Sequence, residues 1–165
     1  MSLRSLFFLL VLGLAVPLVS GCRPITPAEL QEWGTRTYAG TSVGAAYKAT
    51  LTAVRSQGYD IASADGGSGQ IKTAPKVMVV VVSGGQYSAA AASNSIAWDF
   101  DVKSSPQGVT IHATPRGYSA GQSVPTSQMS ASYMKKAFAT IFDEIERNLG
   151  VAPPAPAGSG SAKTH

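Results

Sequence analysis

The sequence has few charged residues, one cysteine and two histidines. Charged side chains make up 13% of its 165 residues, whereas hydrophobic side chains make up 44%. This composition lacks the charge density of an intrinsically disordered chain, and the length suits one domain with a hydrophobic core. The formal net charge is +4, and apart from Lys135 and Lys136 the basic residues are scattered singly. The scatter argues against nucleic-acid binding, which usually requires Lys and Arg clustered on one face.

Catalytic and cofactor motifs are also missing from the sequence. Its 17 glycines do not form G-x-G-x-x-G, and Gly40 and Gly44 are not followed by the Lys and Ser or Thr of a phosphate-binding loop. A metal site requires several converging His, Cys, Asp or Glu side chains, and Cys22 is the only cysteine. We therefore predict no cofactor, no metal site and no enzymatic activity.

Residues 1–21 have the layout of a secretory signal peptide. Arg4 is followed by an almost entirely apolar run from Leu6 to Val19, and small residues come next. A helix needs about 20 apolar residues to cross a bilayer, and this run is shorter. A permanent transmembrane anchor is therefore the weaker interpretation of the segment.

The residues Val19, Ser20, Gly21 and Cys22 resemble the lipobox of bacterial lipoproteins. In that family an aliphatic residue and two small ones precede a cysteine whose thiol becomes a lipid thioether. The resemblance implies removal of the leader and a membrane anchor of acyl chains on Cys22. It favours the outer membrane, because Arg23 rather than aspartate follows the cysteine. The alternative is a secreted protein with an incidental cysteine, but a single cysteine in an exported chain has no internal disulfide partner.

The remaining sequence divides into a tether, one domain and a tail. We predict that residues 22–34 form the lipidated tether and a short helix, because Thr26 and Glu29 have the spacing of a capping box. Residues 35–150 are predicted to fold as an α+β domain on the periplasmic side of the membrane. Residues 151–165 are rich in Pro, Ala, Gly and Ser and are expected to be disordered.

Hydrophobic periodicity predicts two main helices in the domain. Apolar residues recur on one helical face between Ser42 and Gln57, and again from about Ser127 until Gly150 ends the second helix. Four consecutive valines from Val79 favour β structure in the middle of the chain. Strands are predicted over residues 35–39, 59–64, 70–74 and 76–82 and over the two halves of a later hairpin.

That hairpin is predicted by two segments of alternating apolar and polar residues, 96–103 and 109–114. Each segment has one face suited to burial. A loop over residues 104–107 places Phe100 opposite Ile111, so that apolar side chains meet across the two strands. The hairpin is therefore predicted to supply much of the core of the sheet.

Together these elements predict a two-layer α+β fold. It consists of an antiparallel twisted sheet of four to five strands with two main helices on one face, an arrangement similar to a helix-grip fold. The other face of the sheet is then open to solvent or to a partner. The polar segment 115–125 is interpreted as an irregular loop, and the composition of residues 84–94 predicts no particular structure.

The predicted hairpin brings Asp99, Asp101 and His112 onto its polar face, with Asp99 opposite His112. A carboxylate beside an imidazole is able to perform acid–base catalysis, so a hydrolase using Asp99 and His112 is one alternative. A structural role is favoured, because cross-strand pairs of this kind stabilise a sheet without any further function. No nucleophile or oxyanion donor can be identified near these residues in the sequence.

One stretch of the domain resembles small domains of envelope lipoproteins. It contains residues 58–61, then Asp65, residues 69–71 and Thr73, between an amphipathic helix and a hairpin. A similar case is the helix-grip domain of the BamC lipoprotein of the outer-membrane barrel assembly machinery, and the resemblance covers about residues 36–149. It implies a non-enzymatic binding or scaffold role with a protein partner in the cell envelope.

Two binding functions follow from these predictions. The first is a membrane-tethered module that holds an envelope protein on its open sheet face or sheet edge. The second is a carrier of an apolar ligand, in a cavity lined by Val80, Phe138 and Phe142 beneath the long helix. Of the two tryptophans, Trp98 belongs to the buried face of the hairpin, whereas Trp33 lies either at a lipid interface or in the core at a helix end.

Overall fold

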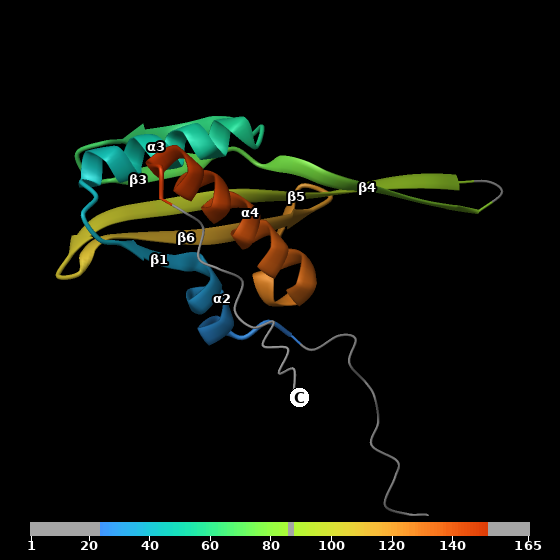
Figure 1. The fold of residues 1–165 in the computed structure, drawn as a ribbon. Coiled ribbons are helices and arrows are strands. Elements are labelled where there is room, and N and C mark those ends of the chain that lie inside the picture. Colours follow the sequence, from blue (N-terminus) through green and yellow to red (C-terminus); the bar gives the residue numbers. More distant parts are fainter. Residues whose placement is uncertain (1–23, 86–87, 152–165) are drawn as a thin grey trace, which may run out of the picture.

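The computed structural model describes residues 24–85 and 88–151, and for residues 79–85 and 88–92 it describes the backbone alone. The predicted leader, Cys22 and residues 152–165 lie outside these ranges. The described chain has an α+β fold of two layers, in which an antiparallel sheet carries helices on one face (Figure 1). The predicted fold class is therefore confirmed. The described sheet has seven strands rather than four to five.

The helices begin and end at their capping residues. The Thr26 hydroxyl accepts a hydrogen bond from the backbone N–H of Glu29, whose carboxylate accepts one from the Thr26 N–H, as the capping box predicts. Ser42 caps the next helix, and Gly150, with a φ of 69°, ends the last. That last helix begins later than Ser127, because a short 3-10 helix precedes it. The helices are α2 (Pro27–Gly34), α3 (Val43–Ser56) and α4 (Ala131–Leu149), and the 3-10 helix η1 spans Thr126–Gln128.

The sheet is antiparallel at every pairing, with the strand order β1-β6-β5-β3-β2. Two further strands lie off this path, since β4 pairs with β5 and β7 pairs with β6. The strands are β1 (Thr35–Tyr38), β2 (Ile61–Asp65), β3 (Gln70–Thr73), β4 (Lys76–Gly85), β5 (Ser88–Ser105), β6 (Gly108–Ser119) and β7 (Gln122–Val124).

The predicted register of the central hairpin was wrong by two residues. Phe100 lies opposite Ala113 rather than Ile111, because residues 106–107 alone form the loop between β5 and β6. Gly108 permits this tight connection with a φ of 133°. A shift of two residues keeps every side chain on its predicted face, since the period of a strand is two.

Residues 115–125 do not form the irregular loop that we predicted. β6 continues through the first half of this segment, and a turn with positive φ at Ala120 and Gly121 leads into β7. Pro115 and Gly117 occupy buried positions of β6 where an aliphatic side chain is usual. The hydrophobic alternation that identifies a strand is therefore missing from the sequence here.

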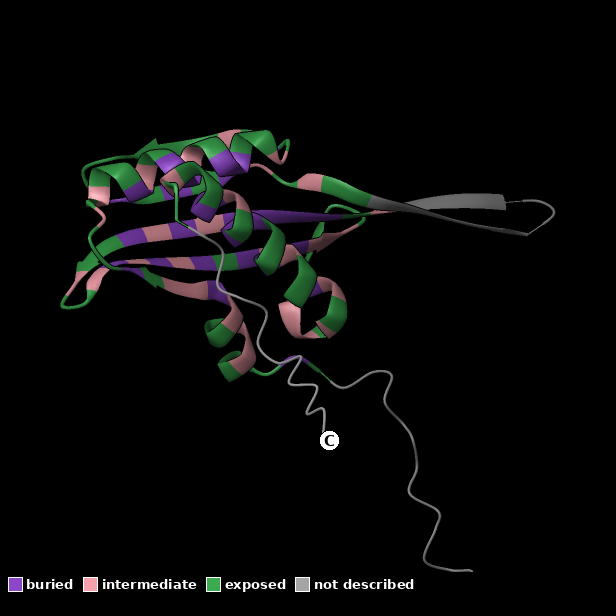
Figure 2. Cartoon of the chain, in the orientation of Figure 1, coloured by how far each residue is buried: buried purple, intermediate pink, exposed green. Residues whose placement is uncertain are grey.

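The hydrophobic core lies between the sheet and helices α3 and α4 (Figure 2). Trp98 is fully buried, as predicted, and its ring meets that of Phe138 edge-on with the centroids 5.0 Å apart. Trp33 is half-buried at the end of α2, with its ring centroid 6.5 Å from that of Phe138, which favours the core alternative. Other large buried side chains are Ile71, Ile96, Phe100, Val102, Ile111, Met134, Phe142 and Ile145.

One carboxyl group is buried in this core. Glu146 on α4 is 3% exposed and accepts a hydrogen bond of 3.4 Å from the Tyr38 hydroxyl on β1. Burial raises the pKa of the Glu146 carboxyl, although the Tyr38 hydrogen bond acts in the opposite direction. Burial also raises the pKa of Tyr38, with Glu146 as the next cause. The pair therefore connects the last helix to an edge of the sheet.

Candidate functional site

The structure places the predicted polar-face residues together around a shallow hollow. Asp99, Asp101 and His112 line a hollow of about 210 Å³ on the sheet. Asp101 is the residue opposite His112, whereas Asp99 lies opposite Thr114, so the predicted pairing of Asp99 with His112 was wrong. The cause is the same two-residue shift, which changes partners across the hairpin but preserves the face.

Each of these three side chains has its own partner on a neighbouring residue. His112 Nδ1 lies 2.9 Å from the Thr35 hydroxyl on β1, and the Asp101 carboxylate forms an ion pair with Lys103. Asp99 forms an ion pair with Arg116 at 3.0 Å. In the described ranges no three His, Cys, Asp or Glu side chains are placed to hold a metal ion. These contacts suit a structural role for the hollow, and its use by a hydrolase stays an untested alternative.

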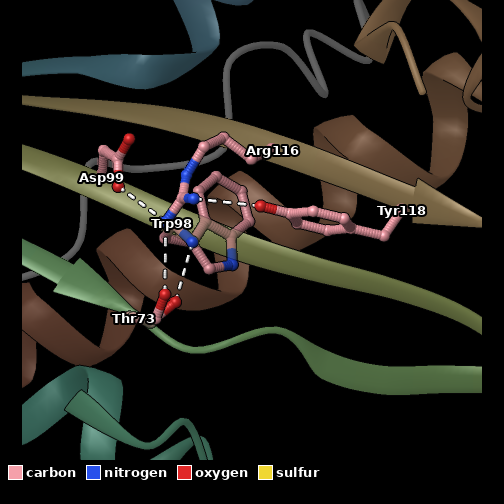
Figure 3. A network of polar contacts seen from close by, with 5 residues as sticks. All are labelled: Thr73, Trp98, Asp99, Arg116 and Tyr118. Atoms are coloured by element: carbon pink, nitrogen blue, oxygen red, sulfur yellow. Dashed lines mark hydrogen bonds and ion pairs between the residues drawn. The ribbon is translucent and has the colours of Figure 1, made fainter. Parts of the chain in front are cut away.

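Arg116 forms the centre of a polar network on β6 (Figure 3). Besides its ion pair with Asp99, it donates hydrogen bonds to the Tyr118 hydroxyl at 3.0 Å and to the Thr73 carbonyl at 3.3 Å. The Thr73 hydroxyl in turn accepts a bond of 2.8 Å from the backbone N–H of Trp98. The network therefore joins β3, β5 and β6. Arg116 was not predicted as a site residue, because it lies in the segment interpreted as a loop.

Beyond this network, β4 and the first part of β5 form a ribbon that leaves the rest of the sheet (Figure 1). We call residues 77–85 and 88–93 the arm. β4 and β5 pair from Lys76 opposite Ile96 to Gly85 opposite Ser88. β6 pairs with β5 only as far as Asn94, so the arm is two strands wide. Most of residues 84–94, whose structure the sequence did not predict, belong to the end of the arm.

The arm has no charged residue. From Val77 to Trp98 the sequence contains no Asp, Glu, Lys, Arg or His. Lys76 precedes the arm, but its ammonium group donates to the Gln57 carbonyl at the end of α3 and lies 5.2 Å from the ring centroid of Tyr59. Edge strands in water are usually protected by charges, prolines or bulges. The arm has a register irregularity near its base but carries neither charge nor proline of its own.

A pocket of about 400 Å³ lies at the base of the arm, and we call it the root pocket. The Tyr133 hydroxyl at its wall is buried and has no hydrogen-bond partner among the described residues. Burial raises the pKa of this phenol. The volume is within the usual range for small-molecule sites. The pocket has a mixed lining. Apolar and aromatic side chains come from Met78, Ile96, Tyr118, Val124, Met129 and Tyr133, and polar residues are Asn94, Ser95, Ser119, Gln128 and Ser130.

The root pocket differs from the cavity that the sequence suggested. Phe138 and Phe142 are each 1% exposed and belong to the packed core, and neither lines the root pocket. Both side chains face the body of the sheet, whereas the pocket lies where α4 begins. The side chain of Val80, the third predicted lining residue, lies outside the described part of the structure. The root-pocket residues come from β4 to β7, η1 and α4, a combination that no sequence pattern signals.

Comparisons with known proteins give little further information. No family model and no curated protein matches the chain. A solved structure of a DUF4468 family protein from Bacteroides ovatus ATCC 8483 is similar at a TM-score of 0.39 and 13% identity. The similarity covers 73% of this chain and 85% of that chain. At this level it supports no transfer of function.

Proposed function

We propose that the protein is a lipid-anchored, non-enzymatic binding module of the cell envelope that holds a protein partner on its arm. The anchor is a set of acyl chains on Cys22, at the periplasmic face of the outer membrane. The support for the anchor is the sequence pattern that ends at Cys22, which lies outside the described residues. In the ranges that are described, no helix is both long and apolar enough to span a bilayer.

The observation that carries the binding role is the uncharged arm. Its outer backbone groups have no neighbouring strand in the described sheet, so they are available to pair with an added strand. A two-stranded ribbon is at best marginally stable in water by itself. Binding of a partner strand would widen the ribbon and cover apolar residues. The polar hollow offers a partner no open strand edge, and its Asp99 and His112 side chains already have partners, although one buried oxygen of Asp101 has no hydrogen bond among the described residues.

The start of the fold is close to the proposed anchor. Ile25 is 2% exposed, and its backbone N–H donates to the Ser127 carbonyl at 3.4 Å. Only Arg23 and Pro24 lie between Cys22 and Ile25, and the three steps from one residue to the other span at most about 11 Å when extended. The domain is therefore expected to lie against the bilayer, within reach of other proteins attached to the same membrane.

The anchor is tested by intact-mass analysis of the native protein and by cell fractionation. We expect a mass that matches a chain beginning at Cys22 with added acyl groups, and we expect a Cys22→Ser variant to leave the membrane fraction. An unmodified thiol, or retention of residues 1–21, would remove the lipid anchor from the proposal.

The binding role is tested by a photo-crosslinking amino acid placed in living cells at Val77, which is 54% exposed at the base of the arm. A specific crosslinked protein is expected there. The control carries the same amino acid at Ala139, an exposed position on α4. If Val77 captured no more protein of any kind than Ala139, the arm would have no binding role.

A second candidate function, carriage of an apolar ligand, is favoured by the root pocket. Its methionine and aliphatic side chains suit a hydrocarbon chain, and its polar side chains, among them Tyr133 with a buried hydroxyl that has no partner, suit a polar head group. Native mass spectrometry of the acyl-free chain is expected to show a bound lipid, and added lipid is expected to raise the melting temperature. A chain with no bound lipid and no thermal shift would reject this candidate.

A further inference from the structure

We infer that the outer edge of β4 pairs with the same edge of a second copy of this chain, antiparallel and about a two-fold axis. The inference rests on the proposed function in one respect, namely that the arm is the binding element. Beyond that function, it specifies that the arm binds through the outer edge of β4 rather than that of β5, and that the partner is a second copy of the chain.

The sequence of β4 is that of a strand buried on both faces. Between Val77 and Val82 it has no polar residue, so a strand of period two has no polar face in this stretch. Continuous apolar runs of this kind are typical of strands covered from both sides. In the described sheet, however, β4 pairs with β5 alone. β4 therefore has the composition of a core strand but a neighbouring strand on one side only.

The outer edge of β4 has no neighbouring strand in the described sheet, and its pairing with β5 is regular beyond the irregularity between Val77 and Val79. β2 pairs with β3, and this pairing ends at Ile61 opposite Thr73, before β4 begins. Along β4 the backbone N–H and C=O groups of one edge then lack a strand partner in the described chain. A bilayer is a poor alternative partner, because the hydrocarbon core offers nothing that can hydrogen-bond to unsatisfied backbone groups. A protein strand satisfies these groups directly.

A second copy fits this edge because β4 is complementary to itself. With Val81 on the two-fold axis, Val77 of one copy lies opposite Gly85 of the other, and the uncharged stretch of residues 77–85 pairs with its own counterpart. Both copies of Lys76 then fall outside the paired region. A parallel pairing in register would place the two lysines side by side, and like charges on neighbouring strands are destabilising. Two-fold dimers are also the commonest symmetric assemblies.

The outer edge of β5 suits a second copy less well. Ser93 is the first residue of β5 that lies beyond its pairing with β6, and its carbonyl already accepts a hydrogen bond of 2.9 Å from the Ala120 N–H. The sequence of residues 88–93 consists of alanine and serine, which bury less apolar area than valine. These differences favour the β4 edge.

The first test is sedimentation of the chain from residue 22 onward with Cys22→Ser, which retains every residue of the described fold. A concentration-dependent dimer is expected. Val81→Lys places two like charges together at the axis and is expected to raise the dimer dissociation constant by about tenfold or more. The control is Ala62→Lys on β2, an exposed position of another edge strand, which is expected to leave the dimer unchanged.

The second test is disulfide trapping, in which Val81→Cys becomes the only cysteine of the Cys22→Ser chain. On the axis the two Cα atoms fall within the range that a disulfide can join, so oxidation is expected to give a covalent dimer. Val77→Cys is the matched control and is expected to stay monomeric, because its counterpart lies far along the partner strand. Trapping at Val77 instead of Val81 would overturn the antiparallel register.

Two further outcomes separate this inference from the proposed function. A chain that is monomeric at all concentrations, yet crosslinks another envelope protein at Val77 in cells, would overturn the self-pairing and leave the binding role intact. A monomeric chain that crosslinks nothing at Val77 would overturn both. A dimer broken by Ala62→Lys and not by Val81→Lys would assign the interface to β2.

Discussion

The body of the sheet and the arm share one strand but differ in what surrounds it. In the body, β5 has β6 on one side and β3 on the other, and it buries Ile96, Trp98 and Phe100. In the arm, the same strand over residues 88–93 has β4 alone as its partner strand. The difference shows that a single strand is part of the core at one end and part of a two-stranded ribbon at the other, according to its neighbours.

The two regions also differ in polar interactions. On the body, Arg116 connects three strands through Asp99, Tyr118 and Thr73. The arm has no charged side chain to form such a network or to repel another strand. Polar contacts between side chains therefore connect the strands of the body, whereas the arm contains no ion pair between its own residues.

The largest effect is expected from Trp98→Ala in the body. Removing a fully buried aromatic ring is expected to lower the free energy of unfolding by about 3–5 kcal/mol, through lost burial and a residual cavity. Val77→Ala at the base of the arm is the matched control, and a change within about 0.5 kcal/mol is expected because this side chain is largely exposed. Denaturant unfolding of the monomer measures both. Equal losses would show that the arm belongs to the cooperative core.

The next largest losses of stability are expected from alanine substitutions at two glycines with positive φ. Gly121→Ala, at the β6–β7 turn where no other atom is near, is expected to cost about 1–2 kcal/mol from backbone strain alone. Gly69→Ala in the body is expected to cost more, since its Cβ would lie 2.1 Å from the Val102 carbonyl oxygen. Unfolding free energies of the two variants give the difference. If the two variants lost the same amount, the close approach of β5 to Gly69 would be without consequence.

A smaller effect is expected from Arg116→Gln. The loss of the ion pair and of its hydrogen bonds is expected to lower the free energy of unfolding by about 1 kcal/mol, a modest value because the group is partly exposed. Hydrogen exchange at the backbone amide of Trp98 is also expected to become faster. Lys135→Gln, on the exposed face of α4, is the control and is expected to change neither quantity. Unchanged exchange in Arg116→Gln would show that the strands hold together without the network.

The smallest effect is expected from a change of pH, which alters the free energy of unfolding through Glu146 in the body. Because burial raises the pKa of Glu146 above 4.5, the folded chain binds this proton more tightly than the unfolded chain does. The free energy of unfolding therefore falls as the pH rises from 4.5 through the raised pKa. The pKa of Asp65 is lowered, chiefly by the hydrogen bond from the Ser68 hydroxyl. Its contribution to the free energy of unfolding is therefore lost only as the pH falls below 3.8.

Glu146→Gln is expected to remove that slope in unfolding experiments run from about pH 4 to pH 8. Dimerisation through the arm is expected to keep its strength over the same range, because the arm contains no carboxyl group or histidine. If the pH dependence of the unfolding free energy persisted in Glu146→Gln, another titrating group would be its cause. A pH-dependent dimer would place a titrating residue at the interface.

Much of the body was predictable because its signals are local. The capping box at Thr26 and Glu29, the αL glycine at Gly150 and the burial of Trp98 all follow from residues near in sequence. The pairing of Phe100 was not predictable, because two registers that differ by two residues bury the same face. Arg116 and the root pocket were missed, since they depend on segments that are distant in the sequence.

The sequence by itself determined the main helices, the buried faces of the central hairpin, the absence of charge from residue 77 to residue 98 and the proposed lipid signal at Cys22. Only the tertiary structure decided that the uncharged stretch leaves the sheet as an arm. The physical reason is that periodicity reports which side chains avoid water, whereas the number of partners beside a strand depends on where β2, β3 and β6 end. The arm has an open edge because these strands stop before it.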